Sequence, residues 1–136
     1  MIDSFRDEYF FLSNFYKTPI KYGLLVYPSV EHAFQAQKTN NQNLRITISK
    51  MSSPAEAKRK GRVLELRPDW IRVRLNIMEN LLRIKFSDDT LSQMLQHTRP
   101  HILVEGNTWG DTFWGVCRGK GENHLGKLLM QIRAEG

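Results

Sequence analysis

The longest regular pattern in the sequence is an apolar repeat that follows Pro68-Asp69 and continues to about residue 86. Its apolar side chains recur at steps of three and four residues, the spacing that places them on one face of an α-helix: Ile71, Leu75, Met78, Leu82 and Phe86. The repeat predicts the longest helix of the chain, and it favours a fold built mostly from helices.

Capping residues predict shorter helices on both sides of this repeat. Ser29, which follows Pro28, is a favourable N-cap. The run Ser53-Pro54-Ala55-Glu56 combines an N-cap, a proline in the first turn and a capping-box glutamate, and Gly61 is a candidate cap at its other end. Further helices are expected over residues 43–51, from Ser87 or Asp88 to Gln96, and from Asn123 onward.

The predicted β-structure is small. Residues 9–27 are rich in aromatic and β-branched side chains around a turn at Tyr22-Gly23, which predicts short strands or extended segments with a hairpin. Residues 102–104 predict a short buried strand, and the glycine- and aromatic-rich residues 106–121 follow no period. We therefore expect a compact, predominantly α-helical single domain over residues 1–136, not an alternating βαβ arrangement.

Length and cysteine content restrict the class of protein. A chain of 136 residues is long enough for one domain with a core of its own. The single cysteine, Cys117, excludes an intramolecular disulfide and favours a reducing compartment. The first residues lack the apolar run of a signal peptide, and no stretch is long enough to span a bilayer. We expect a cytoplasmic protein without a membrane partner.

The net charge of +6 and the pI of about 9.7 favour a partner that carries phosphate groups. Lysine and arginine are spread along the whole chain, which fits a phosphate pocket at least as well as a nucleic-acid-binding face. A generic basic surface explains the charge equally well.

Two clusters in the first half of the chain contain side chains suited to binding or catalysis. Glu31, Gln35 and Lys38 share one face if the helix after Ser29 continues, although a solvated face with an i, i+4 hydrogen bond is the simpler interpretation. Lys58 and Arg62 are four residues apart, so both could face one phosphate group, or they could complement a helix dipole.

Two further clusters lie in irregular segments. Asn14 stands within an aromatic run, where it could present donors to a planar ligand or form an Asx turn. Asp111 lies between Trp109 and Trp114 in a glycine-punctuated loop. Indole faces suit base stacking, the aspartate suits water activation or ribose hydroxyls, and so aromatic a loop is costly to leave in water.

Other chemistry is poorly supported by the sequence. His97 and His101 are separated by Pro100, and no cysteine–histidine ligand pattern is present, so no metal site is expected. Cys117 has no local base partner. The glycine-rich residues 119–127 lack Walker spacing. We expect no cofactor.

Six motifs, in this order, resemble the YbiA-like family, also called the NADAR family (a DUF1768-type domain). They are FLSNF, YPSVEHAFQAQK, PAEAKRKGR, RPDW, DTFWG and GENHLGKLLMQIR, and they cover nearly the whole chain. The resemblance implies a compact, mainly helical fold and N-glycosidase activity. Its substrates would be ribosylaminopyrimidine phosphates of early riboflavin biosynthesis, or guanine in nucleic acid that carries ADP-ribose. Gln37 and Trp109-Gly110 differ from the family pattern.

The resemblance also implies the site residues. The matching positions are Asn14, Phe15, Glu31, His32, Gln35, Lys38, Lys58, Arg62, Asp111, Trp114 and Asn123. Cleavage of such a bond builds positive charge on the ribose, so a carboxylate is needed near C1′. We expect Glu31 and Asp111 to share that role, and Trp114 with Phe15 to stack on the base. A covalent route is equally open, in which Lys38 forms a Schiff base with C1′.

The remaining positions are expected to bind substrate. Lys58, Arg62 and Asn123 would hold phosphate, while Asn14 and Gln35 would orient ribose hydroxyls or the base edge. Two other functions stay open: a non-catalytic module that binds ADP-ribose or NAD in the same pocket, and a protein that binds unmodified DNA with a strong salt dependence. The expected partner is a small nucleotide-like molecule or ADP-ribosylated nucleic acid; the oligomeric state is open.

Overall fold

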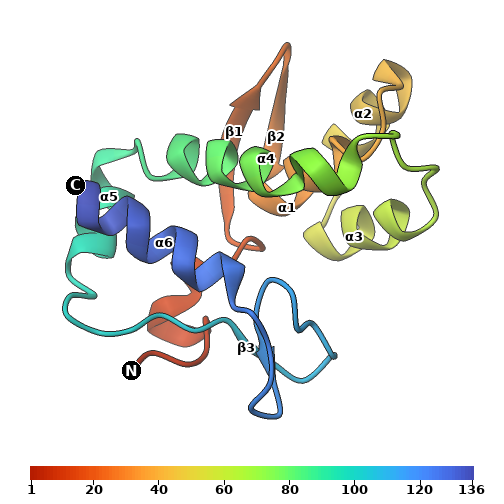
Figure 1. Cartoon of the computed structure of the whole chain (residues 1–136). Helices are drawn as coiled ribbons and strands as arrows, with labels where there is room; N and C mark the ends of the chain where they lie inside the picture. Colours follow the sequence, from red (N-terminus) through yellow and green to blue (C-terminus); the bar gives the residue numbers. More distant parts are fainter. The chain divides into compact units, whose positions relative to one another are not determined.

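The computed structural model describes all residues, 1–136, as helices joined by short strands and loops (Figure 1). Of these residues, 49% are helical and 13% are in strands, so the chain is mixed α/β and the expectation of a predominantly helical fold is met only in part. The backbone divides into two compact units, one formed by residues 14–85 and the other by residues 1–13 together with 86–136. Each unit is described separately.

The unit formed by residues 14–85 contains a hairpin followed by four helices. Its elements are β1 (Lys17–Tyr22), β2 (Leu25–Ser29), α1 (Val30–Ala36), α2 (Gln42–Ser49), α3 (Pro54–Arg62) and α4 (Trp70–Lys85). The capping predictions are confirmed, because the Ser29 side chain accepts a hydrogen bond from the His32 amide and Ser53 accepts one from Glu56. The long apolar repeat forms α4, as predicted.

The hairpin is antiparallel, with Tyr22 paired to Leu25 across the turn. Gly23 adopts a φ of 61° in that turn, a conformation that glycine reaches without steric cost. The turn at Tyr22-Gly23 is thus confirmed. The expectation that the extended region starts at residue 9 is wrong, because Asp7–Leu12 forms a short 3₁₀-helix, η1, that buries Phe11 and Leu12.

Helix α1 is the centre of its unit. It packs against β1, β2, α2, α3 and α4, and all seven of its residues are buried. A short helix surrounded in this way has no solvated face, so the polar side chains that it carries must find partners inside the protein. This placement makes Glu31, His32 and Gln35 the first candidates for a functional role.

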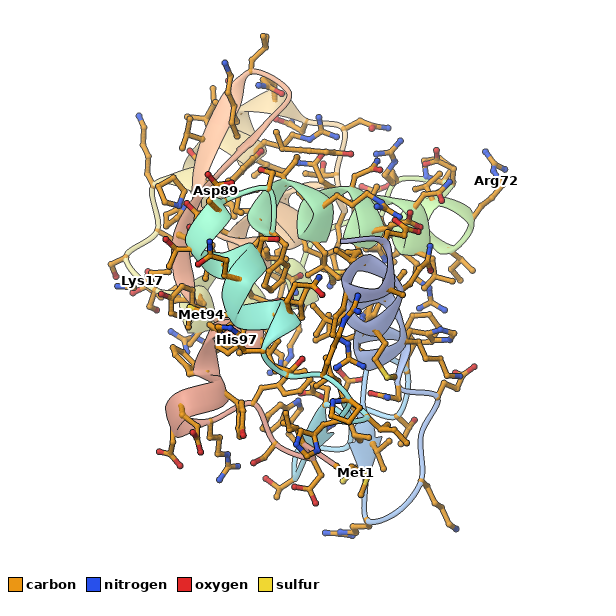
Figure 2. All side chains as sticks on the ribbon, turned by 90° about the vertical axis from the view of Figure 1, so that its left-hand side faces the viewer. Met1, Lys17, Arg72, Asp89, Met94 and His97 are labelled. Atoms are coloured by element: carbon orange, nitrogen blue, oxygen red, sulfur yellow. The ribbon has the colours of Figure 1, made fainter.

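The other unit contains η1, α5 (Asp89–Gln96), β3 (Gly106–Asn107), β4 (Val116–Cys117) and α6 (His124–Glu135). Asp88 caps α5, as predicted, and Figure 2 shows Asp89, Met94 and His97 along this helix. Strands β3 and β4 pair in parallel. The strand expected at residues 102–104 is reduced to a single bridge between Ile2 and Leu103, and Ile102 is exposed. None of the six α-helices has the length and apolar character that crossing a membrane requires.

Candidate active site

Glu31 and Gln35 lie one turn apart on α1 and are joined by a hydrogen bond. The Gln35 Nε2 amide donates to the Glu31 carboxylate at 2.6 Å, and both residues are buried. The shared face predicted for these two residues is confirmed. A carboxylate removed from water needs such donors to stay ionised.

The other end of the Gln35 amide is unsatisfied. Its carbonyl oxygen, Oε1, is buried and accepts no hydrogen bond, although Gln35 is only 5% exposed. This oxygen lies directly against Gly61 of α3, where a Cβ atom would come within 1.8 Å of it. Gly61 therefore allows α3 to pack against the amide, and it lies inside α3 instead of forming the cap that the sequence suggests.

Lys38 lies beyond the end of α1 at Ala36, so the helical face expected for Glu31, Gln35 and Lys38 does not extend to it. Its side chain is half-buried. Burial lowers the pKa of its ammonium group, the Glu31 carboxylate opposes that effect, and the positive charges of Arg62 and Lys58 add to it. The Lys38 amine is therefore within the electrostatic influence of the α1 carboxylate and of two α3 cations. An amine whose pKa is lowered by burial and by neighbouring cations is a better nucleophile near neutral pH.

The segment 14–16 runs beside the start of α1. The Asn14 carbonyl accepts a hydrogen bond from the Glu31 amide at 3.0 Å, and its side-chain Nδ2 donates to the Met78 sulfur at 3.7 Å. The Asn14 Oδ1 atom is buried and has no hydrogen-bond partner. The Lys58 ammonium lies 5.9 Å from the centre of the Phe15 ring. Asn14, Phe15 and Lys58 therefore border the same cluster.

A second lysine, Lys85 at the end of α4, is almost completely buried. Its ammonium lies 5.4 Å from the centre of the Tyr16 ring, and burial lowers its pKa from 10.5 to about 7. Lys38 is influenced by the charges of Glu31, Lys58 and Arg62, whereas burial alone lowers the pKa of Lys85.

The expectation that His32 binds substrate does not fit its surroundings. The side chain is fully buried, its Nδ1 lies 2.7 Å from the Ser29 hydroxyl, and its Nε2 lies 3.0 Å from the Met51 carbonyl. Because a carbonyl only accepts, the ring nitrogen facing it carries the proton and the other accepts from Ser29. Both nitrogens are occupied, so His32 joins α1 to the chain after α2; burial also lowers its pKa.

Asp111 and Trp114 belong to the other unit, where the carboxylate organises a turn. Asp111 Oδ1 accepts hydrogen bonds from the Phe113 and Trp114 amides at 3.1 and 2.9 Å. The Asn107 Nδ2 donates to the Asp111 carbonyl, and the Asn107 Oδ1 accepts from the Asp111 amide. The Trp114 ring meets Phe113 edge to face, with their centres 4.8 Å apart. The predicted meeting of Glu31 and Asp111 around one sugar stays a prediction.

The phosphate-binding role expected for Asn123 is also at odds with the structure. Its Nδ2 donates to the Leu103 carbonyl at 3.0 Å, and its Oδ1 accepts from the Glu105 amide at 3.0 Å. Asn123 adopts a left-handed conformation before α6 and is buried. Its amide is therefore used to hold residues 103–105, which are irregular backbone that cannot satisfy itself.

The structure thus brings seven of the expected residues together in the unit of residues 14–85: Asn14, Phe15, Glu31, Gln35, Lys38, Lys58 and Arg62. It also shows contributors that sequence reasoning missed, above all Gly61 and Met78. No local pattern marks either of them, because their importance comes from contacts with Gln35 and Asn14. No group of three or more potential metal ligands is present. The cluster defines a site in which a half-buried lysine follows a helix that carries a buried carboxylate, and in which the neighbouring helix α3 contributes two cations.

Comparison with known proteins identifies the family of this chain. The NADAR domain family matches residues 3–135. N-glycosidase YbiA of Escherichia coli is 41% identical over 136 residues, which covers 97% of this chain and 84% of that protein. The riboflavin biosynthesis protein PYRR of Zea mays is 37% identical over 123 residues, covering 80% of this chain and 20% of that protein.

A solved structure is also similar to this chain. The NMR structure of the E. coli protein YbiA matches with a TM-score of 0.85 and 39% identity, covering 99% of this chain and 86% of that one. The chain belongs to the NADAR family.

Proposed function

We propose that this chain hydrolyses the bond between C1′ of a phosphorylated ribose and an amino group, with a ribosylaminopyrimidine phosphate or ADP-ribosylated guanine as substrate. The class of enzyme, a hydrolase of N-glycosyl bonds, follows from the family and from the N-glycosidases to which the chain is similar. The pyrimidine substrate is favoured by two relatives that are named riboflavin biosynthesis proteins.

One observation carries the proposal: the buried Glu31 carboxylate is bonded to Gln35, and the Gln35 and Asn14 side chains each keep a buried oxygen without a partner. Burial also lowers the pKa of Lys38, which follows the same helix. A glycosylamine opens to an imine at C1′, and the neutral Lys38 amine adds to that carbon. The substrate amine then leaves with a proton, and a Schiff base to Lys38 remains. Water adds to this Schiff base and releases the sugar phosphate and the free lysine.

The other side chains of the cluster support the steps around C1′. Glu31 accepts a proton from the attacking water and stabilises the positively charged intermediate. Lys58 and Arg62 bind phosphate, while Phe15 provides an apolar face for the base. The unpartnered oxygens of Asn14 and Gln35 are acceptors for the ribose hydroxyl groups. A route without a covalent intermediate would instead use Glu31 and Asp111 as a pair of carboxylates.

A side-by-side assay tests the proposal. Purified protein is incubated separately with the ribosylaminopyrimidine phosphate and with a guanine oligonucleotide that carries ADP-ribose, and the released base is measured by chromatography. We expect release from at least one substrate, and a loss of at least about a hundredfold in turnover for Lys38→Ala. Lys50→Ala, which removes an exposed lysine after α2, is the matched control.

The same assay distinguishes the alternatives. Saturable binding of ADP-ribose or NAD without release of base from either substrate would show a binding module instead of an enzyme. Tight binding to unmodified DNA that weakens linearly in log salt would favour the nucleic-acid-binding function.

A further inference from the structure

Lys38 lies in the segment that follows α1. The backbone carbonyls of this segment have no hydrogen-bond donors within the helix. The amides of Gln37, Lys38 and Thr39 still donate to carbonyls of α1, but the helix ends at Ala36. The carbonyls of these three residues therefore lie beyond the helical ladder and need other donors. Where those donors come from determines how firmly Lys38 is held.

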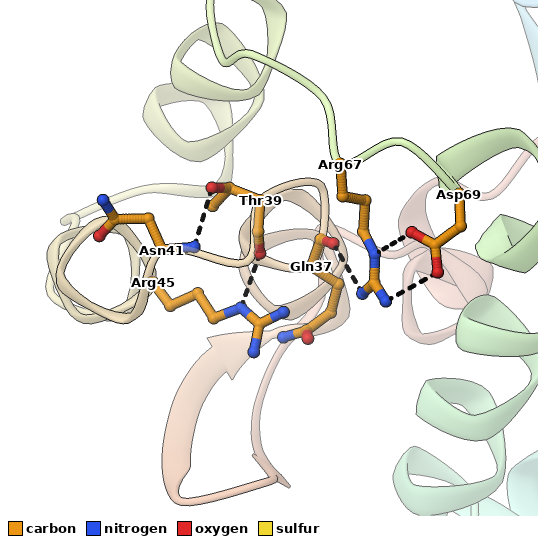
Figure 3. A network of polar contacts seen from close by, with 6 residues as sticks. All are labelled: Gln37, Thr39, Asn41, Arg45, Arg67 and Asp69. Carbon is orange, nitrogen blue, oxygen red and sulfur yellow. Dashed lines mark hydrogen bonds and ion pairs between the residues drawn. The ribbon is translucent and has the colours of Figure 1, made fainter.

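Two arginines from different parts of the chain supply these donors, and Figure 3 shows the contacts of Arg67 with Gln37 and of Arg45 with Thr39. Arg67, in the loop before α4, donates its backbone amide to the Lys38 carbonyl at 2.8 Å and its Nη1 to the Gln37 carbonyl at 3.5 Å. Arg45 of α2 donates its Nε to the Thr39 carbonyl at 2.9 Å. Arg67 therefore binds two successive carbonyls, those of Gln37 and Lys38.

Arg67 is itself fixed by Asp69. The guanidinium Nε and Nη2 donate to the two carboxylate oxygens of Asp69 at 2.6 and 3.1 Å. This fork-to-fork geometry orients the guanidinium and leaves Nη1 directed at the Gln37 carbonyl. The hydrogen bond from Arg67 also lowers the pKa of the Asp69 carboxyl group. The pair is partly exposed, with side chains 20% and 28% accessible, so its salt bridge alone adds little stability.

We propose that Arg67, oriented by Asp69, is a positioning residue that holds the Lys38 backbone so that the Lys38 side chain keeps its half-buried position at the end of α1. The proposal rests on the function proposed above for Lys38. Arg67 acts through the main chain and does not contact the reacting atoms. A side chain that only stabilises the fold would reduce the amount of folded protein, whereas a positioning residue changes the properties of Lys38 in the folded protein.

The charges that face Lys38 make this difference measurable. Its amine is influenced by Glu31 of α1 and by Lys58 and Arg62 of α3, in addition to burial. If the segment loosens, the amine moves toward water, loses these influences and regains the ordinary pKa of 10.5. Less of it is then neutral at neutral pH, and the pH at which activity rises moves upward.

The experiment measures the pKa of Lys38 directly in folded Arg67→Gln protein. Lys38 is labelled competitively with acetic anhydride over a range of pH, and the Lys38 peptide is quantified by mass spectrometry. We expect a Lys38 pKa closer to 10.5 than in the wild type, a kcat lower by about tenfold or more, and a KM changed by less than about threefold. Asp69→Asn, which keeps Arg67 but weakens its fork, should shift both quantities in the same direction by less.

Arg83→Gln is the matched control, because it removes one arginine and one arginine–carboxylate pair, with Glu79 at 3.0 Å on α4. It should leave the Lys38 pKa unchanged. Folded Arg67→Gln and Asp69→Asn proteins with the wild-type Lys38 pKa and kcat would overturn the positioning role. If Arg67→Gln does not fold, Asp69→Asn decides alone. The labelling needs no turnover, so a wild-type protein inactive on both substrates would contradict the proposed function while the labelling still tests Arg67.

Discussion

The surroundings of Glu31 and of Asp111 differ in how their polar side chains are used. Around Glu31, two side-chain oxygens, on Asn14 and Gln35, are buried without a partner. Around Asp111 the side chains of Asp111, Asn107 and Asn123 all bond to backbone groups of irregular segments. The sequence makes both regions candidates for function, yet only the region around Glu31 has buried side-chain oxygens without a hydrogen-bond partner.

The largest expected effect is the loss of turnover when the Glu31 carboxylate is removed. Glu31→Gln keeps an acceptor for the Gln35 amide but removes the charge, so kcat should fall about 10²–10⁴-fold while the unfolding transition stays near that of the wild type. Steady-state kinetics and urea unfolding measure the two quantities. A Glu31→Gln protein with wild-type turnover would remove Glu31 from the site.

Asp111 should behave in the opposite way. Asp111→Ala removes the acceptor for two backbone amides, so the free energy of unfolding should fall by about 1–3 kcal/mol. Asp111→Asn keeps that acceptor, and both its stability and its kcat should stay close to the wild type. A loss of a hundredfold or more in kcat at unchanged stability in Asp111→Asn would contradict a purely structural role for Asp111. It would favour the route that uses two carboxylates.

A smaller effect is expected at the contact between α3 and Gln35. In Gly61→Ala the new methyl group would come within 1.8 Å of Gln35 Oε1, which forces the amide away from Glu31. We expect a loss of about 1–3 kcal/mol in unfolding free energy and a kcat about tenfold lower. The matched control is the same substitution in a Gln35→Ala background, where the stability loss should shrink. An equal loss in both backgrounds would show that Gln35 is not the group displaced.

The smallest expected effect is the pH dependence of stability that Lys85 causes. Its pKa is about 7 in the folded protein and 10.5 when unfolded, so between these values the unfolded chain binds more protons. The free energy of unfolding therefore rises with pH between about 7 and 10.5. Burial of Lys85 costs no charge-related stability above pH 10.5, and that cost grows as the pH falls toward 7. Thermal unfolding followed from pH 7 to pH 10 should show a shallower rise for Lys85→Met than for the wild type. Identical slopes would contradict the pKa.

Local patterns predicted much of the secondary structure, because caps and apolar spacing depend on nearby residues. The N-caps Ser29, Ser53 and Asp88, and the repeat that forms α4, are of this kind. The 3₁₀-helix at Asp7–Leu12 was missed because its aromatic composition also suits a strand.

The site was only partly predictable for a different reason. The spacing of Glu31 and Gln35 places them on one helical face, but that α1 is buried on every side follows only from its neighbours. Likewise, His32 and Asn123 look available in the sequence. Only the coordinates show that both ends of each side chain are already bonded.

The most direct test of the central claim is to trap the Schiff base. Wild-type protein is mixed with substrate and sodium borohydride, and the reduced adduct is located by peptide mass spectrometry, with Lys85→Met as a control for the other buried lysine. We expect a sugar phosphate attached to Lys38 in both proteins and to no other lysine. A catalytically active protein that yields no adduct, together with a Lys38→Ala variant of full activity, would contradict it.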